Sequence, residues 1–273
     1  MTSGSPQQAH EGTPDRLFIL SVGKCFRLLE CLNGAQRPLT MTELVHLSGL
    51  DKSAVQRLTH TLLKLGYLRQ HQQSRAYTLS SRMLEFGHTV LSTDSVREVA
   101  DPHLQRLNQK TGETVNLMEL EGNEIVYVSR YPSVHPVSVN LHVGSRLPAV
   151  SSAAGRAILA HLPQARADAI MAGPRPQMTP HTITDVPRLQ DILGRVRVDG
   201  FVINNQEAFI GDISLAAPVM NINQEVVGAI NIAVPVPRWT AARARSELAP
   251  LVVQCAQAIS RDLAAQPGAL TAR

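Results

Sequence analysis

Residues Gly49–Gly66 read GLDKSAVQRLTHTLLKLG and predict a helix that begins after Asp51 and ends before Gly66. Aspartate is a favourable N-cap residue because its carboxylate accepts a hydrogen bond from a first-turn N–H, and glycine commonly ends a helix. Apolar residues at helical spacing define one face: Val55, Leu58, Leu62 and Leu65. The polar side chains on the other face are Ser53, Gln56, Arg57 and His60. Such a face suits a DNA major groove, although an ordinary solvated amphipathic helix has the same pattern.

The segments before this helix favour the DNA-binding interpretation. A first helix is predicted from the apolar repeat between Ile19 and Leu32, and Asn33-Gly34 ends it. The run Thr40-Met41-Thr42-Glu43 is a capping box that begins a second helix, which Ser48-Gly49 closes. Two helices joined by a tight glycine-containing turn, the second with a polar face, are typical of a helix-turn-helix.

A predicted hairpin follows directly. Tyr67-Leu68 and residues 76–79 are short strand-like pieces that flank a polar, basic tip, which is the arrangement of a wing that contacts phosphates or the minor groove. We expect Ser53, Ala54, Gln56 and His60 to read bases and Lys52 and Arg57 to anchor the DNA backbone. The expected phosphate partners in the wing are Arg69 and Arg75.

The charge distribution agrees with a DNA-binding function for the N-terminal part of the chain. Of the 273 residues, those from Arg16 to Glu85 carry a net charge of +6, whereas the remainder from Phe86 onward is balanced and the whole chain is +4. A basic N-terminal third predicts a small polyanion-binding domain followed by a domain with another task. An apolar fraction of 44% with 18% charged residues is typical of a globular protein.

Neither a membrane span nor a signal peptide is expected, because no apolar run is long enough and Met1 to Asp15 lack both a basic end and an apolar centre. The cysteines lack metal-ligand spacing and are expected to be free thiols in a reducing cytoplasm: Cys25, Cys31 and Cys255. No metal, cofactor or membrane partner is expected.

The middle of the chain predicts a helix from Ser80 to Gln109 with little interruption before Pro102. It is expected to link two domains, and its surplus apolar face fits either a dimer seam or plain packing within a domain. From Glu113 the apolar period changes to two, which predicts hairpins over 114–128 and 213–234 and a strand over 137–143. Helices are expected over 152–162, 188–198 and 241–264, with a proline-rich stretch over 163–187.

Strands mixed with helices, with antiparallel hairpins dominating, predict an α+β fold. The expected division is a disordered arm over 1–15, a winged helix-turn-helix domain over 16–79, a linker helix over 80–100, an effector-binding domain over 101–265 and a flexible tail over 266–273.

Several motifs in one order resemble the IclR family of bacterial transcriptional regulators, from about Ser21 to Ala264. In the first domain they are Ser21-Val22, residues 49–58 and Leu65-Gly66-Tyr67; in the second they are Leu147-Pro148-Ala149, residues 153–160, Asp199-Gly200-Phe201 and residues 215–219. The resemblance implies a GAF-like α/β effector-binding domain whose pocket lies between the sheet and the helix that begins at Ala153.

Matched by position, the resemblance implies a pocket that uses the backbone of Ala153 and Ala154, the polar side chains of Asn204, Ser214 and Asn231, and an apolar wall of Val139, Leu147 and Ala233. A helix start built of small residues also leaves backbone N–H groups open to a small anion. Close packing of that helix on the sheet is the alternative.

Two positions depart from the family's pattern. Asn204-Asn205-Gln206 stand where relatives usually have acidic residues, which removes repulsion for a carboxylate. Asp212 stands where relatives are often apolar; facing the pocket, it would accept from a ligand hydroxyl and favour hydroxylated acids, whereas at an exposed loop it would do neither.

The sequence is compatible with three functions. The first is a DNA-binding regulator, a homodimer or dimer of dimers, whose operator affinity is set by a small organic acid, such as an aromatic or hydroxylated catabolic carboxylate. The second is an enzyme on a small acid with a nucleic-acid-binding appendage, but the chain has no GxSxG, HExxH or phosphate-loop motif and no catalytic residue is assigned. A purely structural DNA-binding protein leaves the large neutral domain unexplained.

Overall fold

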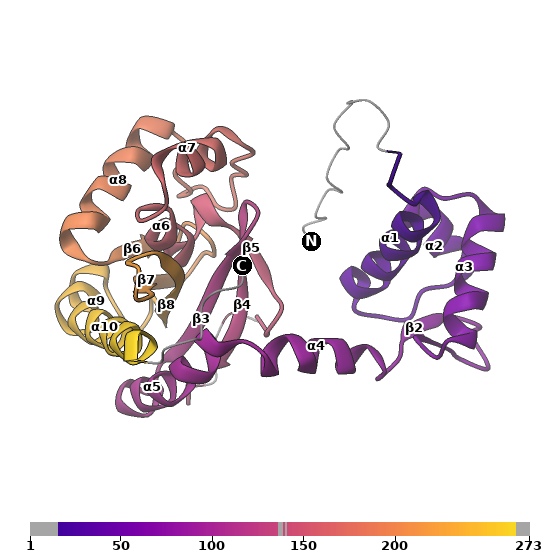
Figure 1. Cartoon of the computed structure of the whole chain (residues 1–273), viewed down its shortest axis with the longest axis horizontal. Coiled ribbons are helices and arrows are strands. Elements are labelled where there is room, and N and C mark those ends of the chain that lie inside the picture. The colour runs from indigo at the N-terminus through magenta and orange to yellow at the C-terminus, as the bar shows by residue number, and fades with distance from the viewer. Residues whose placement is uncertain (1–15, 136–138, 140, 266–273) are drawn as a thin grey trace. The chain divides into compact units, whose positions relative to one another are not determined.

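The computed structural model in Figure 1 describes residues 16–135, 139 and 141–265, and the chain divides between Val90 and Leu91 into two compact units. The expected disordered arm over 1–15 and flexible tail over 266–273 lie outside the described residues.

The first unit is a winged helix-turn-helix, as expected. Its elements are α1 (Leu20–Ala35), α2 (Met41–Ser48), α3 (Lys52–Lys64), β1 (Leu68–Gln70) and β2 (Tyr77–Leu79), followed by α4 (Met83–Ser92). The capping box is present: Thr40 N–H donates to Glu43 Oε2 at 2.8 Å, and Glu43 N–H donates to Thr40 Oγ1 at 3.4 Å. Gly49 turns the chain into α3 at φ +64°, a left-handed conformation that favours glycine.

The single helix expected over 80–109 is wrong. The structure breaks it after Ser92, because the Asp94 carboxylate accepts a hydrogen bond from Arg97 N–H at 3.1 Å and caps a new helix, α5 (Ser95–Thr111). Pro102 lies inside α5 and does not end it. The apolar face of α5 is buried in the core of the second unit, so only α4 remains as a linker helix.

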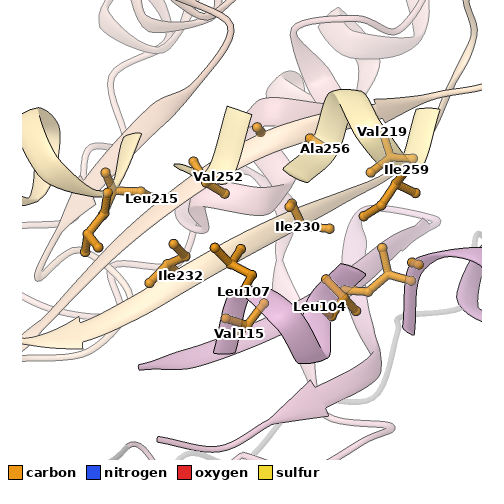
Figure 2. Close-up of a cluster of buried hydrophobic side chains, with 14 of the residues drawn as sticks. Leu104, Leu107, Val115, Leu215, Val219, Ile230, Ile232, Val252, Ala256 and Ile259 are labelled. Carbon is orange, nitrogen blue, oxygen red and sulfur yellow. The ribbon is translucent and has the colours of Figure 1, made fainter. Parts of the chain in front are cut away.

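The second unit is a three-layer α/β domain built on an antiparallel sheet of strand order β5-β4-β3-β8-β7-β6. Its strands are β3 (Thr114–Glu121), β4 (Glu124–Tyr131), β5 (Arg146–Pro148), β6 (Val202–Asn205), β7 (Asp212–Met220) and β8 (Val226–Pro235). Helices α5, α9 (Ala241–Glu247) and α10 (Ala249–Ala265) pack on one face, where leucine, isoleucine and valine side chains interdigitate (Figure 2). Helices α6 (Ala153–Leu159), α7 (Gln164–Ala172) and α8 (Val186–Asp199) join the core on the other face.

Three expectations in this unit need correction. The strand expected over 137–143 is not found at Val139 or Leu141–Val143, and its other residues lie outside the described ones; the strand comes later, as β5, after a turn at Gly144. The proline-rich stretch contains α7, which begins directly after Pro163. The C-terminal helix is divided at Leu248, because Pro250 has no N–H to continue the ladder.

Candidate functional site

Helix α3 presents the polar face that the sequence predicts. Val55, Thr59 and Leu62 are buried and hold the helix on the first unit. Leu65, expected on the same buried face, is exposed at the C-cap of α3. The DNA-binding candidates Lys52, Ser53, Gln56, Arg57 and His60 are exposed, and Ala54 is half-buried.

Hydrogen bonds separate these candidates further. Asp51 accepts from Ala54 N–H at 2.8 Å and from the Ser53 hydroxyl at 2.6 Å, and these bonds hold the pKa of the Asp51 carboxyl below its usual value. Ser53 is therefore partly committed to the cap. Within the described residues, the side chains of Lys52, Arg57 and His60 have no hydrogen-bond or ion-pair partner, so they are available to a ligand.

The wing contains the two predicted phosphate-contacting arginines, Arg69 and Arg75, and only the Arg75 guanidinium is unpaired among the described residues. Arg75 lies at the tip with φ +55°; its carbonyl accepts from Gln70 Nε2 at 2.9 Å, while its exposed guanidinium has no partner among the described residues. Arg69 lies on β1 and donates to Ser81 Oγ at 3.0 Å. Arg82 stacks over the Tyr67 ring and donates to the Leu65 carbonyl, so the side chain of this arginine makes its contacts within the first unit.

The second unit contains a cavity of about 460 Å³ between the sheet and the start of α6. Strand alternation places its polar wall: Ser214 pairs with Ala233, Asn231 pairs with Asn116, and all four side chains face the cavity. The intervening residues, such as Leu215 and Ile232, point to the core under α10 in Figure 2. All nine predicted effector-binding residues line this cavity: Val139, Leu147, Ala153, Ala154, Asn204, Asp212, Ser214, Asn231 and Ala233. Their role in binding stays a prediction.

A chain of hydrogen bonds crosses the cavity wall. Arg130 Nη1 donates to Asn116 Oδ1 at 3.1 Å, Asn116 Nδ2 donates to Asn231 Oδ1 at 2.8 Å, and Asn231 Nδ2 donates to Ser214 Oγ at 2.7 Å. The network fixes the orientation of both amides, so the cavity presents defined donors and acceptors to a ligand.

Arg130 and Tyr127 line the cavity but were not among the predicted residues. They are three positions apart on β4, and a period of two would place them on opposite faces. A β-bulge resolves this, since the pairing shifts from Met118 with Tyr127 to Leu117 with Ser129 and leaves Val128 as an extra residue. The bulge turns Arg130 into the cavity, and no signal in the sequence marks it.

Asp212 faces the cavity rather than the outside, which decides the alternative that the sequence leaves open. Burial raises the pKa of the Asp212 carboxyl to about 7, and the positive charge of Arg130 offsets part of that rise. Burial also raises the pKa of Tyr127, with a further contribution from Asp212, and lowers the pKa of Arg130. The three side chains therefore interact electrostatically.

The start of α6 lines the cavity through Ser152, Ala153 and Ala154. Ser152 Oγ accepts from Gly155 N–H at 2.9 Å, while the N–H groups of Ala153 and Ala154 have no partner among the described residues. A side chain at position 155 would collide with the Ala149 backbone, because an added Cβ would lie 2.1 Å from its carbonyl oxygen. Glycine is needed for this close approach.

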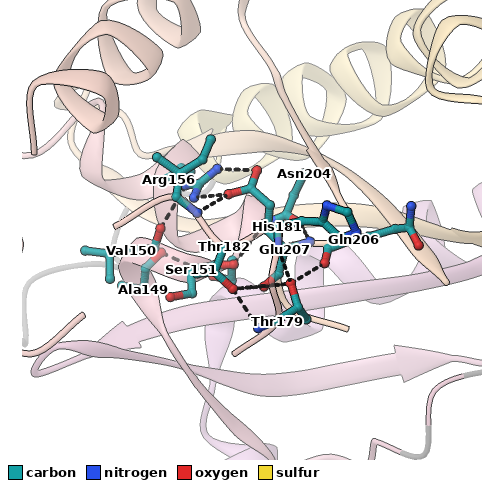
Figure 3. Close-up of polar contacts among 12 residues, drawn as sticks. Ala149, Val150, Ser151, Arg156, Thr179, His181, Thr182, Asn204, Gln206 and Glu207 are labelled. Carbon is teal, nitrogen blue, oxygen red and sulfur yellow. Dashed lines mark hydrogen bonds and ion pairs between the residues drawn. The ribbon is translucent and has the colours of Figure 1, made fainter. Parts of the chain in front are cut away.

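A buried ion pair holds the start of α6 (Figure 3). Arg156 donates to both carboxylate oxygens of Glu207, at 2.9 and 2.6 Å, and its Nε donates to the Val150 carbonyl. The Asn204 side chain donates to the Ser151 carbonyl at 2.8 Å and accepts from Glu207 N–H at 3.0 Å. Asn204 thus lines the cavity with both ends of its amide already engaged.

In the described part of the chain, no group of three or more His, Cys, Asp or Glu side chains is arranged to hold a metal ion. No helix among the described residues is long and apolar enough to cross a membrane.

Comparison with protein-family models matches residues 21–72 to the IclR helix-turn-helix domain and residues 88–261 to the family described as bacterial transcriptional regulator IclR C-terminal. The chain is 31% identical to the Pca regulon regulatory protein of Pseudomonas putida over 261 residues, which cover 95% of this chain and 87% of that protein.

Two solved structures show the same fold. A Rhodococcus protein assigned as a transcriptional regulator has a TM-score of 0.79 and 32% identity, covering 91% of this chain and 99% of that chain. An IclR homologue of Microbacterium hydrocarbonoxydans, solved in complex with 4-hydroxybenzoate, has a TM-score of 0.77 and 24% identity, covering 90% and 100%.

Proposed function

Since the chain belongs to the IclR family of bacterial transcriptional regulators, we propose that it binds operator DNA through α3 and the β1–β2 wing, and that a small organic acid in the α6 cavity sets its operator affinity. The proposed function includes no catalytic step, and binding to operator DNA would require a cytoplasmic protein.

The polar face of α3 supports the DNA-binding half. Lys52 and Arg57 are exposed and unpaired among the described residues, as phosphate anchors must be, and Gln56 and His60 lie beside them on the same helix. Residues 16–85 carry a net charge of +6, which attracts a polyanion before any specific contact forms.

The cavity chemistry supports an acid as the ligand, and this is the observation that carries the effector assignment. Arg130 places a positive charge at the wall, and Ala153 and Ala154 contribute two open N–H groups. Leu147 and Phe209 supply apolar surface, which suits a ring or short chain beside the carboxylate. The complex of the Microbacterium homologue makes 4-hydroxybenzoate a suitable first probe, and we expect an aromatic or hydroxylated carboxylate.

A second copy of the chain is the expected protein partner. Large apolar side chains are exposed on both α1 and α4, including Val22, Phe26, Leu84 and Phe86. An apolar surface of this kind marks an interaction site, and regulators with one short reading helix commonly meet paired half-sites as dimers. We propose a homodimer or a dimer of dimers in which the acid shifts the placement of two winged domains.

Binding to the DNA upstream of the chain's own gene tests the first half of this proposal. Fluorescence anisotropy is expected to show sequence-dependent binding that weakens steeply with salt. Thermal stabilisation by a panel of small acids tests the second half, because a ligand that binds only the native state raises the unfolding temperature. Equal binding to unrelated DNA, or no stabilisation by any acid, would contradict the corresponding half.

A further inference from the structure

Four titratable side chains line the cavity, and their partners determine what charge it presents: Glu113, Tyr127, Arg130 and Asp212. Glu113 is already compensated, because its carboxylate accepts from Arg238 Nη2 at 2.7 Å and from Trp239 Nε1 at 2.8 Å. The Tyr127 phenol is buried and stays neutral, since its pKa is raised. The charge available to a ligand therefore comes from Arg130 and Asp212.

Arg130 has unused hydrogen-bonding capacity. Of the five N–H donors of a guanidinium, one goes to Asn116 and one goes to the Val139 carbonyl at 3.0 Å. The remaining donors have no partner among the described residues, so a ligand carboxylate has donors to approach.

Asp212 stands on the same wall without a partner. Its backbone is paired, with Gln206 N–H donating to its carbonyl at 2.8 Å, but its carboxylate makes no hydrogen bond or ion pair within the described residues, Arg130 included. The surroundings contribute few charges. Tyr127 and Arg130 come from β4, and Glu113, which has its own partners, lies just before β3. Uncharged side chains come from β7, β8 and the loop before β7: Ser214, Pro235 and Phe209. A half-buried carboxylate facing a cavity without a partner is costly when ionised.

Building on the proposed effector function, we propose that the cavity selects acids with a single negative charge and that Asp212 takes up one proton when such an acid binds. The ligand carboxylate lies on Arg130, and the protonated Asp212 donates a hydrogen bond to the ligand. Before binding, the ionised Asp212 carboxylate and the Arg130 guanidinium have a combined charge of zero. After Asp212 is protonated, the positive charge of Arg130 remains and is neutralised by one ligand carboxylate.

This arrangement disfavours a dicarboxylate. Apart from the neutral N–H groups of Ala153 and Ala154, a second carboxylate would meet the Asp212 side chain, the compensated Glu113 and apolar wall. No second free cation lines the cavity among the described residues. A neutral hydroxyl at the same place satisfies Asp212 without an added charge, so hydroxylated monoacids fit better than diacids of equal size.

The direction of the pH dependence follows from the state of Asp212. Its pKa is about 7 in the free protein, and a bound anion raises it further by like-charge repulsion. Affinity is therefore constant at pH values well below 7, where Asp212 is already protonated. Above pH 7 the affinity falls by up to about tenfold per pH unit, because each bound acid must draw a proton from solution.

Isothermal titration calorimetry of the full chain provides the test, with 4-hydroxybenzoate and terephthalate as monoanionic and dianionic probes from about pH 5.5 to about pH 8. Titration in buffers of different ionisation enthalpy counts the protons taken up. We expect uptake approaching one proton per 4-hydroxybenzoate near pH 8, and terephthalate binding at least about tenfold weaker.

Asp212→Asn is the critical variant, since the asparagine amide donates at any pH as the protonated acid does. It is expected to bind 4-hydroxybenzoate without pH dependence, at the wild-type low-pH affinity, and to discriminate less against terephthalate. Asp191→Asn, the same change on the exposed face of α8, serves as the matched control and keeps the wild-type profile. An unchanged urea-unfolding transition of Asp212→Asn, followed by the fluorescence of Trp239 in the same unit, shows that the variant is folded.

The outcomes separate this proposal from the proposed function. Binding of 4-hydroxybenzoate by the wild type without proton uptake, or equal binding of terephthalate, overturns the proton-linked selectivity and leaves the acid effector in place. Failure of both probes to bind at any pH overturns the selectivity and the aromatic-acid assignment together, while operator binding stands on its own measurement.

Discussion

Single side chains on α3 divide into those that hold the helix and those that face outward, and Arg57 is the clearest of the second group. It is exposed, its backbone carbonyl accepts from Thr61 Oγ1, and its guanidinium has no partner among the described residues. Because its side chain supports nothing in the fold, its removal is expected to affect DNA binding alone.

Arg57→Ala should weaken operator binding by about tenfold and lower the slope of the salt dependence by about one. Stabilisation by an acid should be unchanged. Anisotropy titrations over a salt series give both quantities, with Arg166→Ala on the exposed side of α7 as a control for the lost charge. Undiminished operator binding by Arg57→Ala would contradict the assignment of α3 to the DNA major groove.

Asn231 is the central member of the cavity network, since it accepts from Asn116 and donates to Ser214. Asn231→Leu should abolish the response to acid and leave operator binding intact, because leucine can neither accept nor donate and fills part of the cavity. Thermal shift with 4-hydroxybenzoate measures the loss. Asn223→Leu, in the exposed β7–β8 turn, should respond like the wild type; an unchanged response of Asn231→Leu would exclude this residue from the site.

Asp212 also makes stability depend on pH. Its folded-state pKa of about 7 lies above the ordinary 3.8, so the unfolded chain releases the proton first and stability falls as the pH rises from about 4 to about 7. Asp212→Asn should therefore be more stable than the wild type above pH 7, by an amount on the order of 4 kcal/mol, and show no gain near pH 4. Urea titrations at both pH values measure this, and an equal difference at both would contradict it.

The sequence predicts the cavity residues that lie on regular strands, and it does not predict those whose orientation depends on a β-bulge. Ser214, Asn231 and Ala233 were predicted from the family resemblance, and regular strand alternation on β7 and β8 places all three at the cavity, which every predicted position lines. Strand alternation does not reveal Arg130 either, because the bulge at Val128 changes the face of β4 on which Arg130 lies, and bulges depend on tertiary pairing rather than on local sequence.

The position of α6 depends on the buried ion pair between Arg156 and Glu207. Arg156 is 1% exposed and Glu207 is also buried, so removing either partner leaves an uncompensated charge in the interior. The Glu207 carbonyl also accepts from Thr182 Oγ1 at 2.6 Å, which ties the 179–182 turn to the same place (Figure 3).

Glu207→Gln should destabilise the second unit by about 3–5 kcal/mol. The single tryptophan, Trp239, lies in this unit, so its fluorescence during urea unfolding reports the unit directly. The exposed Arg243–Glu247 pair offers the matched control, and Glu247→Gln should have little effect on stability because solvent screens this pair. Equal effects of the two variants would contradict a structural role for the Arg156–Glu207 pair.

Element boundaries show what local sequence can determine. Caps of the first unit were predicted because Thr40, Glu43 and Asp51 act on neighbouring backbone groups. The break before α5 was missed, although Asp94 is an N-cap residue, because the apolar pattern continues across it. The short helix α7 was missed because its nine residues have almost no amphipathic pattern and prolines lie on both sides of it.

For the whole molecule, the division of charge and the exposed apolar surface point to an assembly on DNA. The first unit carries the basic excess, and the second carries the cavity with balanced charge. Leu84 on α4 is 71% exposed, which is unfavourable in water unless a partner covers it.

Leu84→Glu should weaken self-association at least about tenfold, since a charge would enter the apolar interface. Sedimentation velocity over a concentration series measures this. Ile222→Glu, at a comparably exposed turn of the second unit, should leave the assembly unchanged. A wild-type chain that remains monomeric at the concentration of operator saturation would contradict the dimer.

We propose that an acid in the α6 cavity controls the DNA affinity of α3, and one titration measures this coupling. The dissociation constant for DNA upstream of the chain's own gene is measured by anisotropy, with and without saturating acid, in the wild type and in Asn231→Leu. We predict a change of about 5-fold or more in the wild type and none in the variant. An operator affinity that the bound acid leaves unchanged in the wild type would contradict the claim.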